Sequence, residues 1–278
     1  MKLVVKKLLG AMFMKSGDQI LLEVFRHAVF SRPDLLPAFE RVVLLARRKN
    51  QWNEVLKNDV SVEDRFTKIF KDDLWDGGES RSGPGSGLAY TSNLRSRLPA
   101  LFDKYQVKSV FDAPCGDFHW MQHLLAKVNI DYIGGDIVRE LIEKNQKKFG
   151  RTNINFVHVN IIANALPSAD LMICRDCLFH FSYQDILKTL QNFVRSKIAF
   201  LLTTTHTTGL KNRDILTGDF RQINLFDFPF DFTPQPLERI DDWMKPEPER
   251  QMCLWTRAEV EMASERLAAN LSTLPNTD

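Results

Sequence analysis

The residues best placed for ligand chemistry stand between Asp112 and Asp117, in the segment DAPCGD. An apolar run predicts a buried strand at Ser109–Ala113, and a helix follows the loop. A strand, a glycine-containing loop and a helix form the usual arrangement for binding a nucleotide. This loop keeps one glycine, Gly116, whereas a pyrophosphate site uses the order G-x-G-x-x-G, and Asp117 in the first helical turn repels phosphate. The segment therefore predicts a ligand without phosphates and with a cationic part.

Polar residues also end the next predicted strands. Asp136 ends the second strand, 24 residues after Asp112, close to the spacing of an acid that accepts hydrogen bonds from two ribose hydroxyls. Asn160 ends the third strand, and Arg175 and Asp176 end the fourth. S-adenosylmethionine meets these demands, because its amino and sulfonium groups are positive, its ribose needs an acid and its adenine needs a flat apolar slot. A nicotinamide dinucleotide is disfavoured by the first loop.

Short apolar strands alternate with helices from residue 92 onward. This pattern predicts an α/β fold with a Rossmann-like, mostly parallel sheet of seven strands and helices on both faces. The predicted strands are Ser109–Ala113, Tyr132–Asp136, Asn155–Asn160, Leu171–Arg175, Ile198–Thr204, Leu237–Asp242 and Gln251–Trp255. The predicted helices are 92–105, 117–127, 138–148 and 183–194. Ligands of such sheets bind at the carboxyl ends of the strands, near the point where the strand order reverses.

Two regions precede this predicted domain at residues 93–278. Residues 1–70 have helical periodicity and predict a helical N-terminal extension, which holds ten Lys and Arg against four Asp and Glu up to residue 50. The basic excess is either a solvated helix face or a contact with an acidic protein partner or a membrane surface. Residues 71–92 are rich in glycine and predict a loop, which is either an interdomain linker or a lid that contacts the ligand.

The composition is that of an ordinary soluble protein, with 44% hydrophobic residues and a net charge of +2, and does not favour nucleic-acid binding. Cys174 and Cys177 form a CxxC spacing, but the second pair of a zinc site is missing, so no metal is predicted. A reduced, cytoplasmic chain is the simpler interpretation of the cysteines. Nothing in the sequence indicates the oligomeric state.

Several segments resemble the motifs of the class I, Rossmann-like S-adenosylmethionine-dependent methyltransferases, namely VFDAPCGDFHW, YIGGDIV, VNI and ADLMICRDCLFHF. Together with GGESRSGPGS and LLTTT, they also resemble a bacterial subfamily associated with methylation of surface glycans or natural products. The resemblance covers roughly residues 72–256. It implies an enzyme whose cofactor is S-adenosyl-L-methionine and whose acceptor is a small molecule or a glycan.

The resemblance also implies a set of cofactor contacts. Asp112, Gly116 and Asp117 are expected at the methionine end, Asp136 at the ribose and Asn160 at the adenine edge. Arg81 is a candidate for the methionine carboxylate, or else a solvated loop arginine. The other residues expected in the cofactor site are Ala113, Cys115, Ile137, Ile161 and Arg175. The chain departs from the family in two ways, because the first motif lacks two glycines and Asn160 stands where Asp is usual.

Methyl transfer from a sulfonium is an in-line displacement, and a hydroxyl acceptor also needs a base for its proton. His180 is the first candidate base and shares a helical face with Asp176, four residues earlier. His206 and His119 are alternative bases, and each of the three histidines could instead be structural. The residues expected to contact the acceptor are His119, Trp120, Arg213, Asp219 and Arg221.

Three functions remain open at this stage. An O-methyltransferase acting on a small molecule or glycan is the main hypothesis. An N-methyltransferase acting on a peptide or amine is the second. A catalytically weak, methyltransferase-like binding protein is the third, because lost glycines and Asn160 are also expected of a decaying site.

Overall fold

The computed structural model describes residues 52, 54–57, 59–75, 78–207, 209, 211–245 and 247–274. The chain divides into two compact units, Met1–Lys57 and Asn58–Asp278, and the sheet with its helices belongs to the second. The helices predicted before residue 52, with their basic surface, lie outside the described residues.

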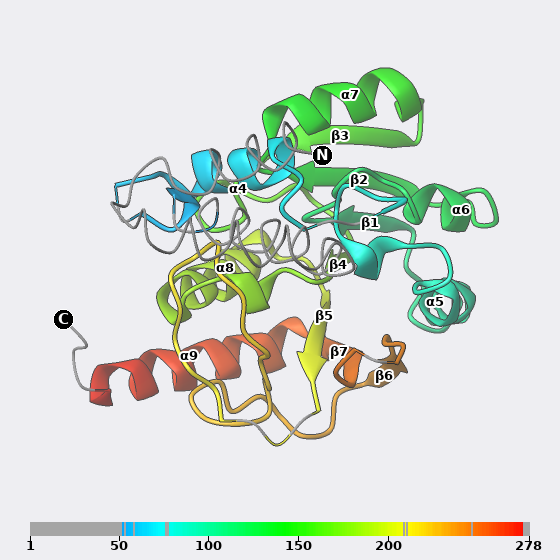
Figure 1. Cartoon of the computed structure of the whole chain (residues 1–278). Helices are drawn as coiled ribbons and strands as arrows, with labels where there is room; N and C mark the ends of the chain where they lie inside the picture. The colour runs from blue at the N-terminus through cyan, green and yellow to red at the C-terminus, as the bar shows by residue number, and fades with distance from the viewer. Residues whose placement is uncertain are drawn as a thin grey trace, which may run out of the picture. The chain divides into compact units, whose positions relative to one another are not determined.

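Seven strands form one sheet in the order β3-β2-β1-β4-β5-β7-β6 (Figure 1). The strands are β1 (Ser109–Asp112), β2 (Asp131–Asp136), β3 (Ile154–His158), β4 (Leu171–Cys174), β5 (Phe200–His206), β6 (Glu238–Asp241) and β7 (Arg250–Thr256). The first five are parallel to their neighbours, whereas β7 runs antiparallel to both β5 and β6. The strand order reverses between β1 and β4, so these two strands border the predicted binding edge. The prediction of a seven-stranded, mostly parallel sheet is confirmed.

The central strands are apolar because both faces of the sheet are covered. All four residues of β4 are buried, and so are three of the four residues of β1. In Figure 1, α5 (Ser92–Lys104) and α6 (Met121–Leu125) lie on one side of the sheet, and α8 (Tyr183–Ser196) and α9 (Arg257–Thr273) lie on the other. Helix α7 (Arg139–Phe149) packs on β2 and β3.

Helix α9 is absent from the sequence prediction, although a capping box marks its start. Thr256 Oγ1 accepts a hydrogen bond from the backbone N–H of Glu259, and the Glu259 carboxylate accepts one from the backbone N–H of Thr256. Its apolar stripe is narrow, since only Val260, Ala263, Ser264 and Leu267 are buried. The helical periodicity of this segment is weak, so α9 was not predicted, although its capping box can be recognised in the sequence.

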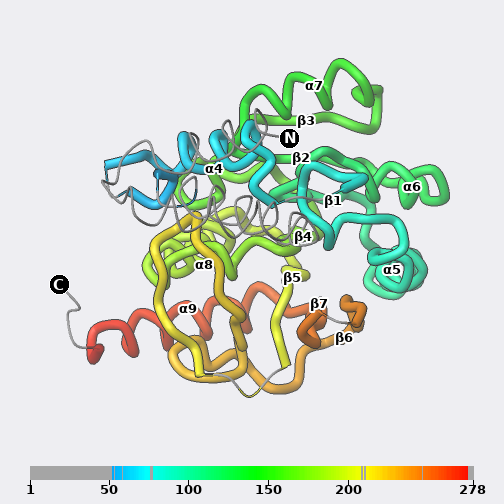
Figure 2. Tube along the Cα trace, in the orientation of Figure 1, coloured from blue at the N-terminus to red at the C-terminus, as the bar shows by residue number. Residues whose placement is uncertain are grey.

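The segment between β5 and β6 is the long yellow-to-orange loop in Figure 2. Phe230 and Phe232 are buried in it, and they pack on Tyr183 and Trp255 respectively. Phe228 is half exposed. Phe230 and Phe232 are therefore packing residues of this loop.

Helix α4 (Val62–Lys71) and the glycine-rich segment after it pack beside the binding edge of the sheet. Ser61 caps α4, because its hydroxyl accepts a hydrogen bond from the backbone N–H of Asp64. A short 3-10 turn, η2 (Pro84–Ser86), interrupts the glycine-rich segment, and a second one, η3 (Leu178–His180), follows β4. Within the described part of the chain, no helix is long and apolar enough to cross a bilayer.

Candidate active site

A cavity of about 260 Å³ opens at the carboxyl ends of β1, β2 and β4. Strand-end residues Asp112, Asp136 and Asp176 line it from the sheet side. Helix α4 and residues 81–86 of the glycine-rich segment line it from the opposite side. The cavity therefore lies where the strand order predicted a ligand site.

Two buried carboxylates stand at the centre of this cavity wall. Asp112 accepts a hydrogen bond from the Tyr132 hydroxyl at 2.7 Å, and burial raises the pKa of Asp112 to about 7. Asp136 accepts hydrogen bonds from the backbone N–H groups of Gly116 at 3.1 Å and Val138 at 3.0 Å. Burial raises the pKa of Asp136 to about 6, because desolvation outweighs these hydrogen bonds. Both carboxyls therefore titrate close to neutral pH.

The loop between β1 and α6 is held tightly at its one glycine. Gly116 has a φ of +54°, and a Cβ at this position would stand 2.1 Å from Ser82 Oγ. Its carbonyl accepts a hydrogen bond from Asn145 Nδ2 at 2.8 Å. Gly116 is thus needed both for the turn and for the close approach of the glycine-rich segment.

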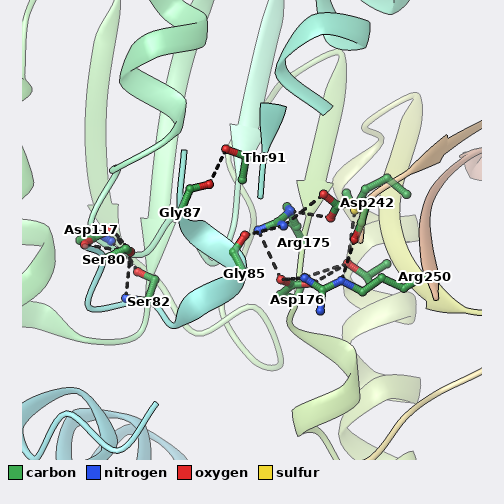
Figure 3. A network of polar contacts seen from close by, with 12 residues as sticks. Ser80, Ser82, Gly85, Gly87, Thr91, Asp117, Arg175, Asp176, Asp242 and Arg250 are labelled. Carbon is green, nitrogen blue, oxygen red and sulfur yellow. Dashed lines mark hydrogen bonds and ion pairs between the residues drawn. The ribbon is translucent and has the colours of Figure 1, made fainter. Parts of the chain in front are cut away.

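Asp117 fastens the glycine-rich segment to the sheet (Figure 3). Its carboxylate accepts hydrogen bonds from Ser80 Oγ at 2.9 Å, the backbone N–H of Arg81 at 2.9 Å and Ser82 Oγ at 3.3 Å. Asp117 is not among the residues that line the cavity. Its carboxylate is thus directed to the glycine-rich segment, and its contact with the methionine end stays a prediction.

Arg81 lines the cavity, but its guanidinium is bound to the end of α4. Nη2 donates to the carbonyl oxygens of Phe70 at 2.5 Å and Lys71 at 3.3 Å. The guanidinium also lies over the Phe70 ring, 5.2 Å from its centroid. Arg81 therefore links the glycine-rich segment to the C-terminal end of α4.

Two arginines and two aspartates form a buried ion network at the ends of β4 and β7 (Figure 3). Arg175 donates to Asp242 at 2.8 and 3.2 Å and to the carbonyl of Gly85 at 2.7 Å. Arg250 donates to Asp176 at 2.9 Å. Although burial by itself would raise the pKa of Asp176, the two arginines hold it below its usual range. Asp176 is therefore an anion that positions Arg175 and Arg250.

The glycine-rich segment sits directly on this network. A Cβ at Gly85 would stand 2.8 Å from both Arg250 Nη2 and Asp176 Oδ2. The Tyr90 ring lies beside Arg250, 4.8 Å from its guanidinium carbon. The segment is thus joined to the sheet at both Asp117 and Arg175, and Gly85 is small enough to permit the second junction.

Two histidines line the cavity in opposite tautomers. His180 Nδ1 lies 2.8 Å from the backbone carbonyl of Asp219, so Nδ1 carries the proton and Nε2 keeps a lone pair. His206 Nδ1 accepts the backbone N–H of Ile223 at 3.2 Å, so in the neutral ring Nε2 carries the proton. Burial lowers the pKa of each ring to about 4, so both are neutral at pH 7. His180 can therefore accept a proton, whereas His206 can donate a hydrogen bond.

Comparison with known proteins identifies the domain around this cavity. Residues 110–196, from β1 to the end of α8, match the family model of a methyltransferase domain. Over these residues the chain is similar to methyltransferase domains. A search of curated protein sequences finds no match.

Solved structures with similar folds agree with this domain. Human N-acetylserotonin methyltransferase in complex with SAM has a TM-score of 0.52 and 14% identity over 76% of this chain and 66% of that chain. PigF with SAH has a TM-score of 0.50 and 14% identity over 72% of this chain and 63% of that chain. A SAM-dependent methyltransferase from Leishmania major has a TM-score of 0.54 and 12% identity over 74% and 90%. At these identities the likeness shows the class I fold, and the chain spans less than two thirds of the first two proteins.

The methyltransferase domain brings most of the predicted cofactor residues to the cavity. The predicted residues that line it are Arg81, Asp112, Cys115, Gly116, Asp136, Ile137, Asn160, Ile161 and Arg175. Ala113 is fully buried and does not line it, because it belongs to the inner turn after β1. Asn160 lies two residues beyond β3, where its side-chain oxygen accepts the backbone N–H of Ile162 at 3.0 Å. The Rossmann-like fold predicted from the motifs agrees with the matched domain and with the fold of the similar structures.

The predicted acceptor residues are placed mostly elsewhere. Trp120 lines the cavity, with its ring 5.7 Å from the Arg175 guanidinium carbon. His119 does not line it and faces Glu79, with 3.7 Å between Nε2 and the carboxylate. His119 thus lies outside the cavity lining, and its roles as a base and as an acceptor contact stay predictions.

The three polar residues predicted from the loop after β5 are also outside the cavity lining. Arg221 is buried and donates to the backbone carbonyls of Leu178 at 3.1 Å and Phe181 at 2.8 Å. Arg213 donates to the carbonyl of Phe220, and Asp219 contributes its backbone carbonyl to His180. In the structure these residues bind the backbone of the loop and of η3, and their role as acceptor contacts stays a prediction.

The residues that the sequence prediction missed are chiefly aromatic. Phe66, Phe70, Phe179 and Phe220 all line the cavity, together with Arg250 from β7. Phe66 and Phe70 come from α4, which had no motif to distinguish it from other helices. Phe179 directly precedes the candidate base His180 in the sequence. It was not predicted to line the site, because an apolar residue after a strand usually belongs to the core.

Proposed function

We propose that the chain is an S-adenosylmethionine-dependent methyltransferase that methylates a hydroxyl oxygen of a small molecule or glycan. The observation that carries this proposal is His180, which lines the cavity and keeps a lone pair on Nε2 because Nδ1 donates to the backbone carbonyl of Asp219. A hydroxyl acceptor must lose a proton during methyl transfer, and a neutral imidazole lone pair is suited to receive it.

The cavity residues fit the cofactor in charge and in shape. Asp136 and Asp112 are acceptor groups for a ribose and for a cationic methionine end, and the single-glycine loop offers no pyrophosphate cradle. Asn160 stands where an adenine edge would meet it, and its carbonyl oxygen has a second lone pair beside the one used by Ile162. Arg81 is already hydrogen-bonded to the end of α4. We therefore propose that it holds the glycine-rich segment in place rather than binding the methionine carboxylate of the cofactor.

When bound, S-adenosylmethionine supplies a methyl group activated by its sulfonium. The residues of the cavity would hold the acceptor hydroxyl in line with that methyl group. His180 Nε2 receives the hydroxyl proton and passes it to solvent beside Phe220, which is 47% exposed. His206 Nε2–H donates a hydrogen bond that orients a polar group of the acceptor. Asp176 holds Arg175 and Arg250 in place and takes no proton.

The glycine-rich segment acts as a lid that excludes water from this reaction. Asp117 and Arg175 hold it at two points, and residues 81–86 form part of the cavity wall. Such closure strengthens electrostatic interactions within the site and aligns the reacting groups.

The test uses purified protein, S-adenosylmethionine and matched panels of hydroxyl and amine acceptors, with formation of S-adenosylhomocysteine as the readout. Mass spectrometry of the product identifies the methylated atom. Replacing His180 by Gln is expected to lower kcat by about 10²- to 10⁴-fold, with cofactor affinity unchanged. His123→Gln is the matched control, because His123 is exposed on α6 and does not line the cavity.

Methylation of oxygen that depends on His180 supports the proposal. Methyl groups found only on nitrogen would replace it with the N-methyltransferase hypothesis. Cofactor binding with no turnover of any acceptor class would favour the methyltransferase-like binding protein.

A further inference from the structure

One end of the cavity is built almost entirely from aromatic rings. We call this group the aromatic cluster, and its members are Phe66, Trp75, Phe179, His180, His206 and Phe220. The rings touch one another in a continuous chain. His180 lies 5.6 Å from Trp75, 4.6 Å from Phe179 and 5.8 Å from Phe220, measured between ring centroids. The proposed base is therefore surrounded by flat apolar faces.

The cluster is assembled from five separate parts of the fold, one of which is β5 with His206. Phe66 comes from α4, Trp75 from the segment after it, Phe179 and His180 from η3, and Phe220 from the loop after β5. Aromatic rings that come together from separate parts of a chain form a hydrophobic core when all of them are buried. Here Phe220 is 47% exposed while Phe179, 5.4 Å away, is 4% exposed. The cluster thus runs from solvent inward to His180, as an entrance would.

The hydrogen-bonding capacity of this end is small. Within the described residues, Arg175, Arg250 and Asp176 already contact one another, Asp242 or the backbone. Arg213, Asp219 and Arg221, which could have bound a sugar, do not line the cavity. The rings of the cluster then offer one acceptor, His180 Nε2, and two donors, His206 Nε2–H and Trp75 Nε1–H, which has no hydrogen-bond partner among the described residues. Glu247 is a further acceptor in the cavity lining. A sugar would leave several of its hydroxyl groups without partners, and each such buried group costs free energy.

We infer that the acceptor is a flat aromatic compound bearing a hydroxyl group, a phenol, rather than a sugar. This inference rests on the proposed O-methyltransferase function and assigns its substrate class. The phenol stacks on Phe179 and Phe220 and presents its hydroxyl to His180 Nε2. Aromatic rings prefer offset or edge-to-face contact with other rings, which the tilted rings of the cluster provide.

The test compares probes that each carry a hydroxyl group but differ in flatness. The full-length protein, saturated with S-adenosylhomocysteine, is titrated with 2-naphthol, with decahydro-2-naphthol and with methyl α-D-glucopyranoside. We expect 2-naphthol to bind at least about tenfold more tightly than either of the other probes. Phe220→Ala should weaken 2-naphthol binding by about three- to tenfold. Phe228→Ala is the matched control, because it is a half-exposed phenylalanine of the same loop that lies outside the cavity lining.

The outcomes separate this inference from the proposed function. If S-adenosylhomocysteine itself does not bind, the proposed function fails. If S-adenosylhomocysteine binds but decahydro-2-naphthol or the glucoside binds as well as 2-naphthol, the phenol inference fails and the proposed function stands. Equal effects of Phe220→Ala and Phe228→Ala would also overturn the inference, because the aromatic cluster would then have no special role.

Discussion

Replacing Asp136 by Asn removes the acceptor group on which the cofactor assignment most depends. Asp136 is 7% exposed, and its two oxygens already accept the backbone N–H groups of Gly116 and Val138. Each carboxylate oxygen has a further lone pair free for a ribose hydroxyl. An asparagine side chain keeps one such oxygen and places an NH₂ group against a backbone donor, so it cannot hold both hydroxyls in the same way.

The size of the effect follows from the type of hydrogen bond. A hydrogen bond to a charged group contributes about 1.5–3 kcal/mol. Loss of one such bond corresponds to a fall in affinity of about 10- to 150-fold. The pH dependence is equally specific, because the pKa of Asp136 is raised by burial to about 6 in the free protein. Affinity should be full well above pH 6 and fall as the carboxylate is protonated, by about tenfold at pH 5.

The assay is isothermal titration calorimetry with S-adenosylhomocysteine from pH 5 to pH 8. Asp131→Asn is the control, because Asp131 is exposed at the start of the same strand. In the Asp136→Asn variant, the affinity should be low and should lose the step near pH 6. Binding of the Asp136→Asn protein that matches the wild type at pH 7.5 would refute the assignment of Asp136 to the cofactor.

Four further predictions concern the residues around the cavity. Burial lowers the pKa of His180 to about 4, so kcat at saturating substrates should not fall through protonation of this ring between pH 8 and pH 5. A loss of kcat centred near pH 6.5 that disappears in His180→Gln would contradict this lowered pKa. Asp117→Ala should weaken S-adenosylhomocysteine binding by roughly tenfold in calorimetry, because the lid loses its anchor, and unchanged affinity would show that the anchor is dispensable. Arg221→Met should lower the free energy of unfolding by about 1–3 kcal/mol in urea, since two buried carbonyls lose their donor. Thr256→Ala should cost about 1 kcal/mol in the same assay with ligand affinity unaltered, and any larger loss of affinity would implicate α9 in the site.

The strands and the cofactor half of the cavity could be predicted from sequence because their signals are local. Apolar runs gave the strands, and the polar residues that ended them gave Asp112, Asp136 and Asn160. In a parallel sheet, the carboxyl ends of neighbouring strands lie at one edge, so residues far apart in the chain could be placed together without knowing any loop.

The aromatic part of the cavity lining could not be predicted in the same way, because its residues come from loops and from helix α4, whose packing on the sheet is not recorded in local sequence. Arg213, Asp219 and Arg221 have suitable chemistry, but the path of their loop turns them toward η3 instead of the cavity. The direction of a side chain in an irregular loop depends on long-range contacts, which no periodicity records. Phe66 and Trp75 were missed for the same reason, since the packing of α4 over the sheet is a tertiary feature.

The tautomers of the two histidines could not be predicted from the sequence either. His180 and His206 were both candidate bases, and one backbone contact on each ring separates them. A carbonyl opposite Nδ1 makes His180 a proton acceptor at Nε2, whereas an N–H opposite Nδ1 makes His206 a donor. The chemistry of each ring is therefore set by the loop between β5 and β6.

The most direct test of the account is a crystal structure of the protein with S-adenosylhomocysteine. The account predicts that the ribose hydroxyls donate to Asp136, that the adenine edge lies at Asn160 and that the sulfur faces His180 and the aromatic cluster. S-adenosylhomocysteine bound elsewhere, or bound in this cavity with its ribose away from Asp136 and its sulfur away from His180, would contradict it.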